Sequence, residues 1–453
     1  MPVSHLLLDS LFICAVIFIW MMLLYQFILS IGGYLLFRKQ DKTAAFIPEK
    51  LLPSVSILIP CRNEQRVIGK LLDKLTSLDY PKGRMEIIVI NDNSTDGTGQ
   101  AALEYASRNG FIRIVDMPFR KSGSGKSAAL NFGLSFASHE VIAVYDADNW
   151  PDRMSLKLLC TALMANPELA AVTGKFRAYN RKKNLLTRMI DIESIAFQWL
   201  IQAGRWKFFK IGFLPGTNFV IRRSVLKKLG GWDELALSED TELTFRLYEE
   251  GYRVMFLPSA VTWEQEPERI SSWVRQRTRW ARGNFYIIAQ HGRRIFTRKR
   301  GNSTRLPATV FEMFYLLNMY YFFIFSIIIS DTLFVLSLAG VIKIRIIGPF
   351  AELWGLALLL FILQLLLSLS FEREDTLKSP FLILLSYLTY TKLWLFVVLK
   401  SLWEELILKK EKIWAKTERF DTSVLSEPES NTTHANIRPV KTIHPACSDG
   451  KTL

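Results

Sequence analysis

Hydrophobic residues form two kinds of pattern along this chain. Between roughly residues 50 and 300, short apolar runs alternate with amphipathic stretches and polar turns. Long apolar runs flank this region, at residues 6–37, 310–338, 349–371 and 380–402. Each long run has at least the roughly 20 residues that a helix needs to cross a bilayer. The pattern therefore predicts a globular domain placed between membrane-spanning segments.

The first apolar run is predicted to be an uncleaved anchor. The ten residues at the start of the chain contain no Lys or Arg, so the basic region of a signal peptide is missing. Arg38, Lys39 and Lys42 follow the run instead, which favours a cytosolic position for the next domain. The 32 residues fit either one tilted helix or two tightly connected ones.

The central region has the pattern of an α/β domain. Buried strands are predicted at residues 54–60, 85–91, 112–117 and 141–145, and helices at 66–78, 98–108 and 127–137. This alternation predicts a doubly wound, mainly parallel sheet. A later amphipathic helix at 241–250 has Ser238 as its expected N-cap, with Leu243, Leu247 and Tyr248 facing inward.

Two aspartates follow the strand at 141–145. Residues two apart in an extended segment point the same way, and ligands bind beyond the carboxyl ends of parallel strands. Asp146 and Asp148 are therefore candidates to hold Mg²⁺ or Mn²⁺ against a diphosphate. The alternative is a polar turn completed by Asn149 and Pro151.

A glycine-rich loop at residues 123–127 resembles the end of a nucleotide-binding P-loop. That motif requires another glycine five positions before Gly125, where this chain has Arg120. We therefore reject a P-loop. A loop that carries Lys126 before a helix can still hold a phosphate, although a flexible solvated turn explains the same residues.

Residues 269–300 are rich in arginine and aromatic side chains, which is typical of a helix in the membrane interface. Gln276 and Trp280 are four residues apart and share one helical face, and Arg279 lies on the same side. An interfacial helix explains the charges and the rings, including Trp280, but it does not explain a glutamine grouped with them.

Composition narrows the class of protein. The chain has 453 residues and a net charge of +15, and many basic residues lie beside the apolar runs. This placement favours membrane orientation and anionic lipid over nucleic-acid binding. The four cysteines fit no zinc or disulfide spacing, which indicates a reduced, cytosolic domain.

The topology of the last third stays open. One anchor plus three later spans places the tail outside, but Lys409, Lys410 and Lys412 argue for the inside. Residues 310–347 would then form two short spans turning near Ser330-Asp331, or one apolar run would lie flat. The tail is expected to be disordered from about Ser423. The expected divisions are a membrane anchor at residues 1–45, a catalytic domain at 46–268, interfacial helices at 269–305, C-terminal spans at 306–405 and a polar tail at 406–453.

Seven motifs in order make the chain resemble the membrane-integrated family 2 glycosyltransferases, which include cellulose, chitin, hyaluronan and poly-N-acetylglucosamine synthases. They lie at residues 59–64 (IPCRNE), 91–97 (NDNSTDG), 125–131 (GKSAALN), 146–148 (DAD), 216–218 (GTN), 238–240 (SED) and 276–280 (QRTRW). Ser238 stands where the family usually has Thr, and the hydroxyl is kept.

The resemblance implies a GT-A-like fold and a UDP-sugar donor. It assigns Glu64 and Asp92 to the uracil and ribose, and places Lys126 near the donor. It also implies that Asp146 contacts the nucleotide sugar and that Asp148 holds the metal, Mg²⁺ or Mn²⁺.

For the reaction, the resemblance implies that Asp240 is the general base with Glu239 beside it. Gln276, Arg279 and Trp280 would close on the diphosphate and the acceptor sugar. Direct displacement inverts the anomeric carbon, so a β-linked exopolysaccharide, of the kind found in biofilms, is expected. UDP-GlcNAc is the expected donor. The C-terminal helices would form an export passage in the plasma or inner membrane. An accessory membrane subunit is a further expected partner.

Two other functions fit parts of the sequence. A transferase that adds one sugar to a polyprenyl-phosphate lipid would share the sheet, the metal site and the membrane segments. An ATP-driven transporter would explain the spans and the glycine-rich loop, but Arg120 argues against it.

Overall fold

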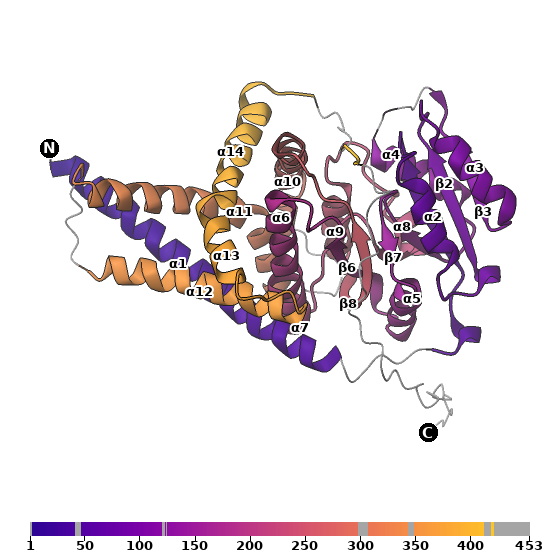
Figure 1. The fold of residues 1–453 in the computed structure, drawn as a ribbon, viewed down its shortest axis with the longest axis horizontal. Coiled ribbons are helices and arrows are strands. Elements are labelled where there is room, and N and C mark those ends of the chain that lie inside the picture. The colour runs from indigo at the N-terminus through magenta and orange to yellow at the C-terminus, as the bar shows by residue number, and fades with distance from the viewer. Residues whose placement is uncertain are drawn as a thin grey trace.

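A computed structural model describes residues 2–40, 47–119, 123, 125–297, 307–342, 348–411 and 418–420. Figure 1 shows a sheet covered by helices at one end of the molecule. The long helices α1 (Pro2–Gln40), α11 (Pro307–Leu338) and α12 (Phe350–Phe371) extend from the other end. The chain thus has a globular part and an apolar helical part, as the hydropathy pattern predicts.

The first half of the sheet is the predicted parallel one. β1 (Val55–Cys61), β2 (Met85–Asn91), β3 (Ile112–Asp116) and β4 (Val141–Val144) pair in the order β3-β2-β1-β4, all parallel. Their side chains are apolar on both faces because helices cover both faces. Leu58 and Ile88 pack into one core, and Ile57 and Ile87 into the other.

The second half of the sheet is mixed. β7 (Phe219–Arg222) runs antiparallel to β4 and to β6 (Leu169–Ala178). β8 (Arg253–Glu264) is parallel to β6, and the short β5 (Trp150–Pro151) closes the edge. The sheet has eight strands in the order β3-β2-β1-β4-β7-β6-β8-β5 and confirms the α/β, mainly parallel class.

Six helices of the globular part lie within the described residues. They are α2 (Ile68–Thr76), α3 (Thr98–Arg108), α4 (Lys126–Phe136), α5 (Ser155–Ala165), α8 (Arg223–Lys228) and α9 (Glu239–Glu249), with short 3₁₀ turns η1 (Glu49–Leu51) and η2 (Lys82–Arg84). The predicted inner face of α9 is buried. Ser238 stands at the predicted N-cap position, but its side chain makes no capping hydrogen bond. Its hydroxyl packs against α10 instead, where a Cβ on Gly283 would lie 2.2 Å from Ser238 Oγ.

The apolar part is built from α1 (Pro2–Gln40), α11 (Pro307–Leu338), α12 (Phe350–Phe371), α13 (Ser379–Leu388) and α14 (Tyr390–Leu402), which ends in the π-turn η5 (Trp403–Ile407). Within the described residues, three segments are long and apolar enough to cross a membrane, namely Leu7–Lys39, Glu352–Phe371 and Ser379–Ile407. A shorter apolar stretch covers Ile324–Leu338. The first apolar run is one helix, not two.

Of the two arrangements left open for this run, the turn near Ser330-Asp331 is excluded, because α11 continues through these residues without a break. The carboxylate of Asp331 makes an ion pair with Lys392 and accepts a bond from Tyr387 Oη at 3.5 Å. This polar residue is therefore satisfied by a neighbouring helix and does not end its own. The disorder predicted from Ser423 lies outside the described residues.

α10 (Ile270–Thr297) connects the two parts of the molecule. Trp273 is fully buried and packs against Tyr390 and Trp394 of α14, and its indole donates to Tyr390 Oη at 3.0 Å. The helix predicted to lie in the membrane interface is therefore packed on one face against protein.

A second connection joins α1 to a long helical segment made of α6 (Leu185–Ala196), the π-turn η4 (Phe197–Gln202) and α7 (Ala203–Phe209). A Cβ on Gly33 would lie 2.1 Å from Trp199 O, and one on Gly204 would lie 2.3 Å from Leu29 O. Glycine at both positions lets the backbones approach closely, as in other membrane helix pairs.

Candidate active site

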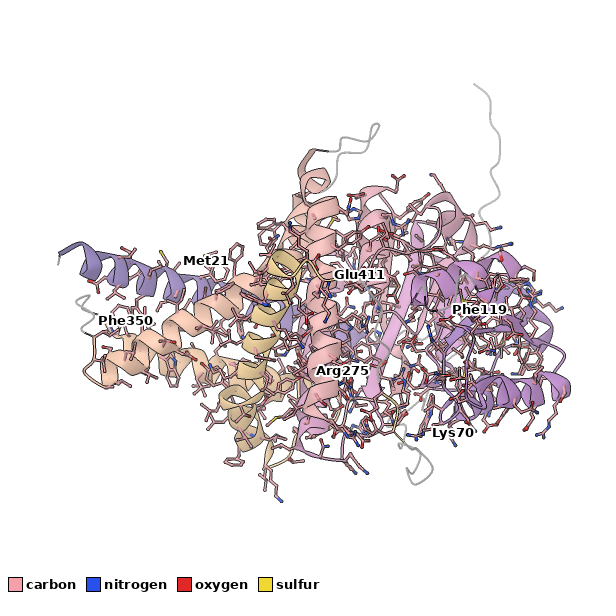
Figure 2. All side chains as sticks on the ribbon, turned by 90° about the horizontal axis from the view of Figure 1, so that it is seen from above. Met21, Lys70, Phe119, Arg275, Phe350 and Glu411 are labelled. Carbon is pink, nitrogen blue, oxygen red and sulfur yellow. The ribbon has the colours of Figure 1, made fainter. Side chains whose placement is uncertain are left out.

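All ten predicted site residues line one cavity of about 730 Å³ beside the carboxyl ends of β1, β2 and β4. They come from three turns of the sheet, from the starts of α4 and α9 and from one face of α10 (Ile270–Thr297): Glu64, Asp92, Lys126, Asp146, Asp148, Glu239, Asp240, Gln276, Arg279 and Trp280. Figure 2 shows side chains between the sheet and α10, the helix that carries the labelled Arg275.

The turns after β1 and β2 are tied together by hydrogen bonds. The backbone N–H of Glu64 donates to Thr98 Oγ1 at 2.7 Å, and that of Thr95 donates to Asn63 Oδ1 at 2.7 Å. Asp92 accepts from Gly123 N at 3.1 Å and lies 3.4 Å from Arg62 Nη1. The glycine-rich loop therefore contacts Asp92.

Hydrogen bonds fix the turn that carries the two aspartates. The N–H of Asp146 donates to Asn149 Oδ1 at 3.0 Å and to Thr217 Oγ1 at 3.1 Å. Asp148 is only 3% exposed and accepts from Gln265 N at 3.1 Å and from Arg419 Nη1 at 2.7 Å. Burial raises the pKa of Asp148, and the charge of Arg419 opposes that shift. The structure thus shows the polar turn with Asn149, and both of its aspartates line the cavity.

The chemistry of this site fits a divalent cation. Two carboxylates on one turn are oxygen donors of the kind that Mg²⁺ and Mn²⁺ take, and a cationic group, the guanidinium of Arg419, already lies against Asp148. Within the described part of the chain, no cluster of three or more His, Cys, Asp and Glu side chains could hold a metal by itself. Mg²⁺ is commonly held by one or two carboxylates together with substrate phosphates, so this donor set suits a metal that binds with a diphosphate.

Lys126 connects the aspartate turn to the start of α9. Its ammonium lies 2.5 Å from Asp146 Oδ1 and 3.4 Å from Glu239 Oε1, and it donates to Gly216 O at 2.8 Å. Gly216 has a φ of +86°, and a Cβ there would lie 3.0 Å from Asp240 Oδ2. Glycine is therefore required at this position, because any side chain would strain the turn and crowd Asp240.

Asp240 has the electrostatic environment of a proton acceptor. Burial and the adjacent carboxylate of Glu239 raise the pKa of Asp240 to about 7, although Lys126 opposes the shift. An efficient general base has a pKa near the operating pH. The fold thus gives Asp240 a property that its position at a helix N-terminus does not require.

The predicted face of α10 points into the same cavity. The Oε1 atom of Gln276 is buried and has no hydrogen-bond partner among the described residues. Arg279 Nη1 donates to Leu237 O at 3.1 Å. Trp280 is 40% exposed, and the guanidinium of Arg277 lies 4.0 Å from its ring centre. The unpartnered acceptor atom of Gln276 indicates a site for a polar ligand.

Among the charged lining residues that sequence reasoning did not predict, three interact electrostatically with Asp148. Glu264 ends β8 and Glu266 stands two positions later, a spacing like that of Asp146 and Asp148 at the end of β4 that could have identified them. Burial raises the pKa of Glu266 to about 7, an effect that Arg277 opposes.

The third missed residue is Arg419, which no strand or helix pattern marks. Its neighbours hold it in place, because Gln265 exchanges two hydrogen bonds with the backbone of Phe420, at 2.8 and 2.9 Å. Glu418 pairs with Arg269 at 3.1 Å. Only the tertiary structure brings this part of the tail to Asp148 and Glu64.

Comparison with known proteins identifies relatives of this arrangement. Residues 56–230 match the family described as Glycosyl transferase family 2. The chain is 44% identical over 419 residues to the probable glycosyltransferase YdaM of Bacillus subtilis (strain 168), a match that covers 91% of this chain and 98% of that protein.

Two further relatives have different named products. The poly-beta-1,6-N-acetyl-D-glucosamine synthase of Staphylococcus epidermidis is 32% identical over 52% of this chain and 55% of its own length. The beta-monoglucosyldiacylglycerol synthase of Nostoc sp. is 30% identical over 81% of this chain and 76% of its own length.

The fold also resembles a solved structure, the mannosyltransferase PcManGT from Pyrobaculum calidifontis in complex with GDP-Man and Mn²⁺. The TM-score is 0.58 at 21% identity, and the match covers 84% of this chain and 99% of that one. At this level of identity the likeness supports the shared fold.

Proposed function

The chain belongs to the family 2 glycosyltransferases, and on that premise we propose that it moves a sugar from a UDP-linked donor to a hydroxyl group at a membrane, with inversion. The observation that carries this proposal is the single cavity in which Lys126 joins the Asp146 turn to Glu239 and Asp240. Donor-binding and proton-accepting groups thus lie side by side.

The donor would lie across the carboxyl ends of the parallel strands. Glu64 and Asp92 suit the ribose and uracil, because each is a hydrogen-bond acceptor on a rigid turn. Asp148 and Asp146 would hold Mg²⁺ or Mn²⁺, which when bound stabilises negative charge on the departing diphosphate. The guanidinium group of Arg419 is planar and can donate paired hydrogen bonds to phosphate oxygens, so we assign it to the same diphosphate.

Asp240 would act on the acceptor. It accepts the proton of the acceptor hydroxyl while the oxygen bonds to the anomeric carbon and the bond from that carbon to the diphosphate breaks. A single displacement of an α-linked sugar gives a β-linkage. Glu239 stays beside Asp240 and keeps the pKa of that residue near 7, so the base is active at neutral pH.

Two classes of acceptor are compatible with this reaction. One class is a growing β-linked glycan made from UDP-GlcNAc, which is favoured by the presence of Gln276, Arg279 and Trp280. In that case the apolar helices would form the passage for the glycan, and an accessory subunit would assist. The apolar lining of the deeper cavity favours a single addition to a lipid. The basic residues Arg38 and Lys39 support a cytosolic catalytic domain on the plasma or inner membrane.

The test uses full-length protein in detergent with UDP-GlcNAc or UDP-glucose and Mg²⁺ or Mn²⁺. We expect metal-dependent release of UDP and a β-anomeric product by NMR. Asp148→Asn and Asp240→Asn should each lower kcat by roughly 10²–10⁴-fold, the range for loss of a catalytic group. Asp116→Asn, on the outermost strand β3, is the matched control and should keep normal activity. Normal rates in both folded site variants would show that the reaction centre lies elsewhere.

A further inference from the structure

The cavity of the active site continues into the apolar part of the molecule. Its lining extends from Asp240 to Phe12 of α1 and Phe350 of α12. Phe350 lies near the tip of the helical part in Figure 2, far from Lys70 and Phe119 of the globular part. Along α1 the lining covers Gln26 to Phe12, which is about 20 Å at 1.5 Å per residue. The cavity thus connects the reacting groups with the depth of the membrane segments.

The deep part of the cavity is lined mainly by hydrocarbon. The side chains there come from α1, α11 and α12 and include Phe12, Val16, Ile327, Phe334, Leu353 and Leu358. Gln26, Ser330 and Asp331 are polar exceptions, and Asp331 is already engaged by Lys392 and Tyr387. A glycan in this space would leave its hydroxyl groups without partners, which is costly, whereas an acyl chain needs none.

The charges near the reacting groups disfavour an anionic acceptor. The described residues lining the cavity include ten acidic and six basic side chains. The basic groups lie against carboxylates, as shown by Arg277 with Glu193 at 3.0 Å and Arg205 with Glu312 at 2.7 Å. A donor diphosphate adds negative charge. A phosphate on the acceptor would therefore meet net repulsion.

We propose that the acceptor is an uncharged membrane lipid with a free hydroxyl group, of the diacylglycerol class. Its acyl chain fills the apolar depth, and its hydroxyl group reaches Asp240. This inference rests on the proposed glycosyl transfer and names its acceptor. The lipid oxygen bonds to the anomeric carbon, UDP leaves, and the proton passes to Asp240. The unpartnered Gln276 Oε1 accepts a hydrogen bond from the sugar or glycerol hydroxyls.

The acceptor is tested with full-length protein in phosphatidylcholine vesicles that contain dioleoylglycerol, a polyprenyl phosphate or neither. With UDP-[¹⁴C]glucose or UDP-[¹⁴C]GlcNAc, we expect label in the organic phase only with dioleoylglycerol, and mass spectrometry should identify a monoglycosyl lipid. Label on the polyprenyl phosphate, or in a water-soluble polymer, would overturn the lipid inference but leave glycosyl transfer standing. Failure to release UDP under every condition would instead overturn the proposed function.

Two neighbouring substitutions test where the acyl chain lies. Ala357 lines the cavity about 20 Å along α12 from Phe371, which is the end of the helix beside the sheet. The neighbouring Leu356 faces outward and is 52% exposed. Ala357→Trp should lower the ratio of the rate with dioleoylglycerol to the rate with short-chain dioctanoylglycerol by roughly tenfold or more. A single methylene group changes selectivity in a filled pocket by roughly this much, and the indole ring is far larger. Leu356→Trp should leave this ratio unchanged.

Activity with dioctanoylglycerol shows that the Ala357→Trp protein is folded. The smaller change Ala357→Leu should give an intermediate ratio. Equal chain-length ratios in wild type, Ala357→Trp and Leu356→Trp would overturn the placement of the acyl chain in this cavity.

Discussion

At the scale of single residues, the catalytic properties of this site come from neighbours and not from residue type. Asp240 is an ordinary carboxylate at the start of a helix, yet burial and Glu239 raise its pKa to about 7. Gly216, at a φ of +86°, has no Cβ, and this leaves room for the carboxylate of Asp240. The same residue without Glu239 and Gly216 would be a poorer base at neutral pH.

This electrostatic arrangement predicts a pH dependence. Asp240 accepts a proton only when ionised, so kcat/KM should rise with pH through an inflection near 7. Glu239→Gln removes the neighbouring negative charge, which lowers the pKa of Asp240 and should move the inflection to lower pH. The measurement is kcat/KM for UDP release between pH 5 and pH 9. Glu104→Gln, on the exposed face of α3, should leave the profile unchanged. An inflection that stays in place in Glu239→Gln would mean that another group titrates.

At the scale of elements, buried ion pairs hold the apolar helices on the sheet. Glu372, just after α12, accepts bonds from Lys175 and Arg177 of β6 and from the indole of Trp199 in η4. Burial alone would raise the pKa of Glu372, but Lys175 and Arg177 lower it to about 2. The cavity keeps its shape because α12 is fixed to β6 at this point.

Loss of this carboxylate should weaken the connection. Glu372→Gln leaves two buried cations without their partner, and we expect the free energy of unfolding to fall by about 3 kcal/mol at pH 7. The pKa of Glu372 is lower in the folded chain than in the unfolded one. Its stabilising effect is therefore present above about pH 4.5 and is lost as the pH falls towards 2.

Thermal unfolding in detergent at pH 7 and pH 3 tests this sign, because the difference between wild type and Glu372→Gln should shrink at pH 3. The exposed pair of Glu168 and Arg253 is the control, and Glu168→Gln should change stability by only about 0.5 kcal/mol. An equal difference at both pH values would contradict the assigned role of Glu372.

At the scale of the whole molecule, segments far apart in the chain build one structure around the cavity. α1 packs against α7, η4, α11 and α12, and its side chains line the same cavity as Asp240. Arg419 arrives at Asp148 from the other end of the chain. Catalytic and apolar parts are therefore not independent modules joined by a linker.

This arrangement predicts a membrane topology. Leu377 lies in the exposed turn after α12, next to the ion pairs with β6, whereas Leu338 is exposed at the end of α11 that points away from the sheet. With Cys14 and Cys447 replaced by Ser, Leu377→Cys should react with a membrane-impermeant maleimide only in inverted vesicles. Leu338→Cys should react only in intact cells. Labelling of both positions from the same side would contradict a chain that crosses the membrane between them.

The strands and the candidate site could be predicted because both leave local patterns. The apolar runs that became β1 and β2 differ from their predicted ends by at most one residue. The ten site residues stand in short motifs at strand and helix ends, and all ten meet in one cavity. Roles within the site stay predictions until the variants are measured.

The errors occurred where long-range contacts decide the outcome. A turn near Asp331 was one of two open alternatives, but Lys392 satisfies the charge of Asp331 and α11 continues. Ser238 stands at the expected N-cap position of α9, but its side chain packs against Gly283 and makes no capping bond. Arg419 had no local signal, because its partners Asp148 and Glu64 are distant in sequence. A local pattern contains no information about such partners.

The sequence by itself determined the α/β class, the apolar segments and the kinds of side chain available for glycosyl transfer. Periodicity and strand-end chemistry are local properties, and a single chain displays them directly. Tertiary structure alone decided the pKa of Asp240, the place of Arg419 and the apolar depth beneath the reaction site. Burial, charge proximity and cavity shape arise only when distant segments pack together.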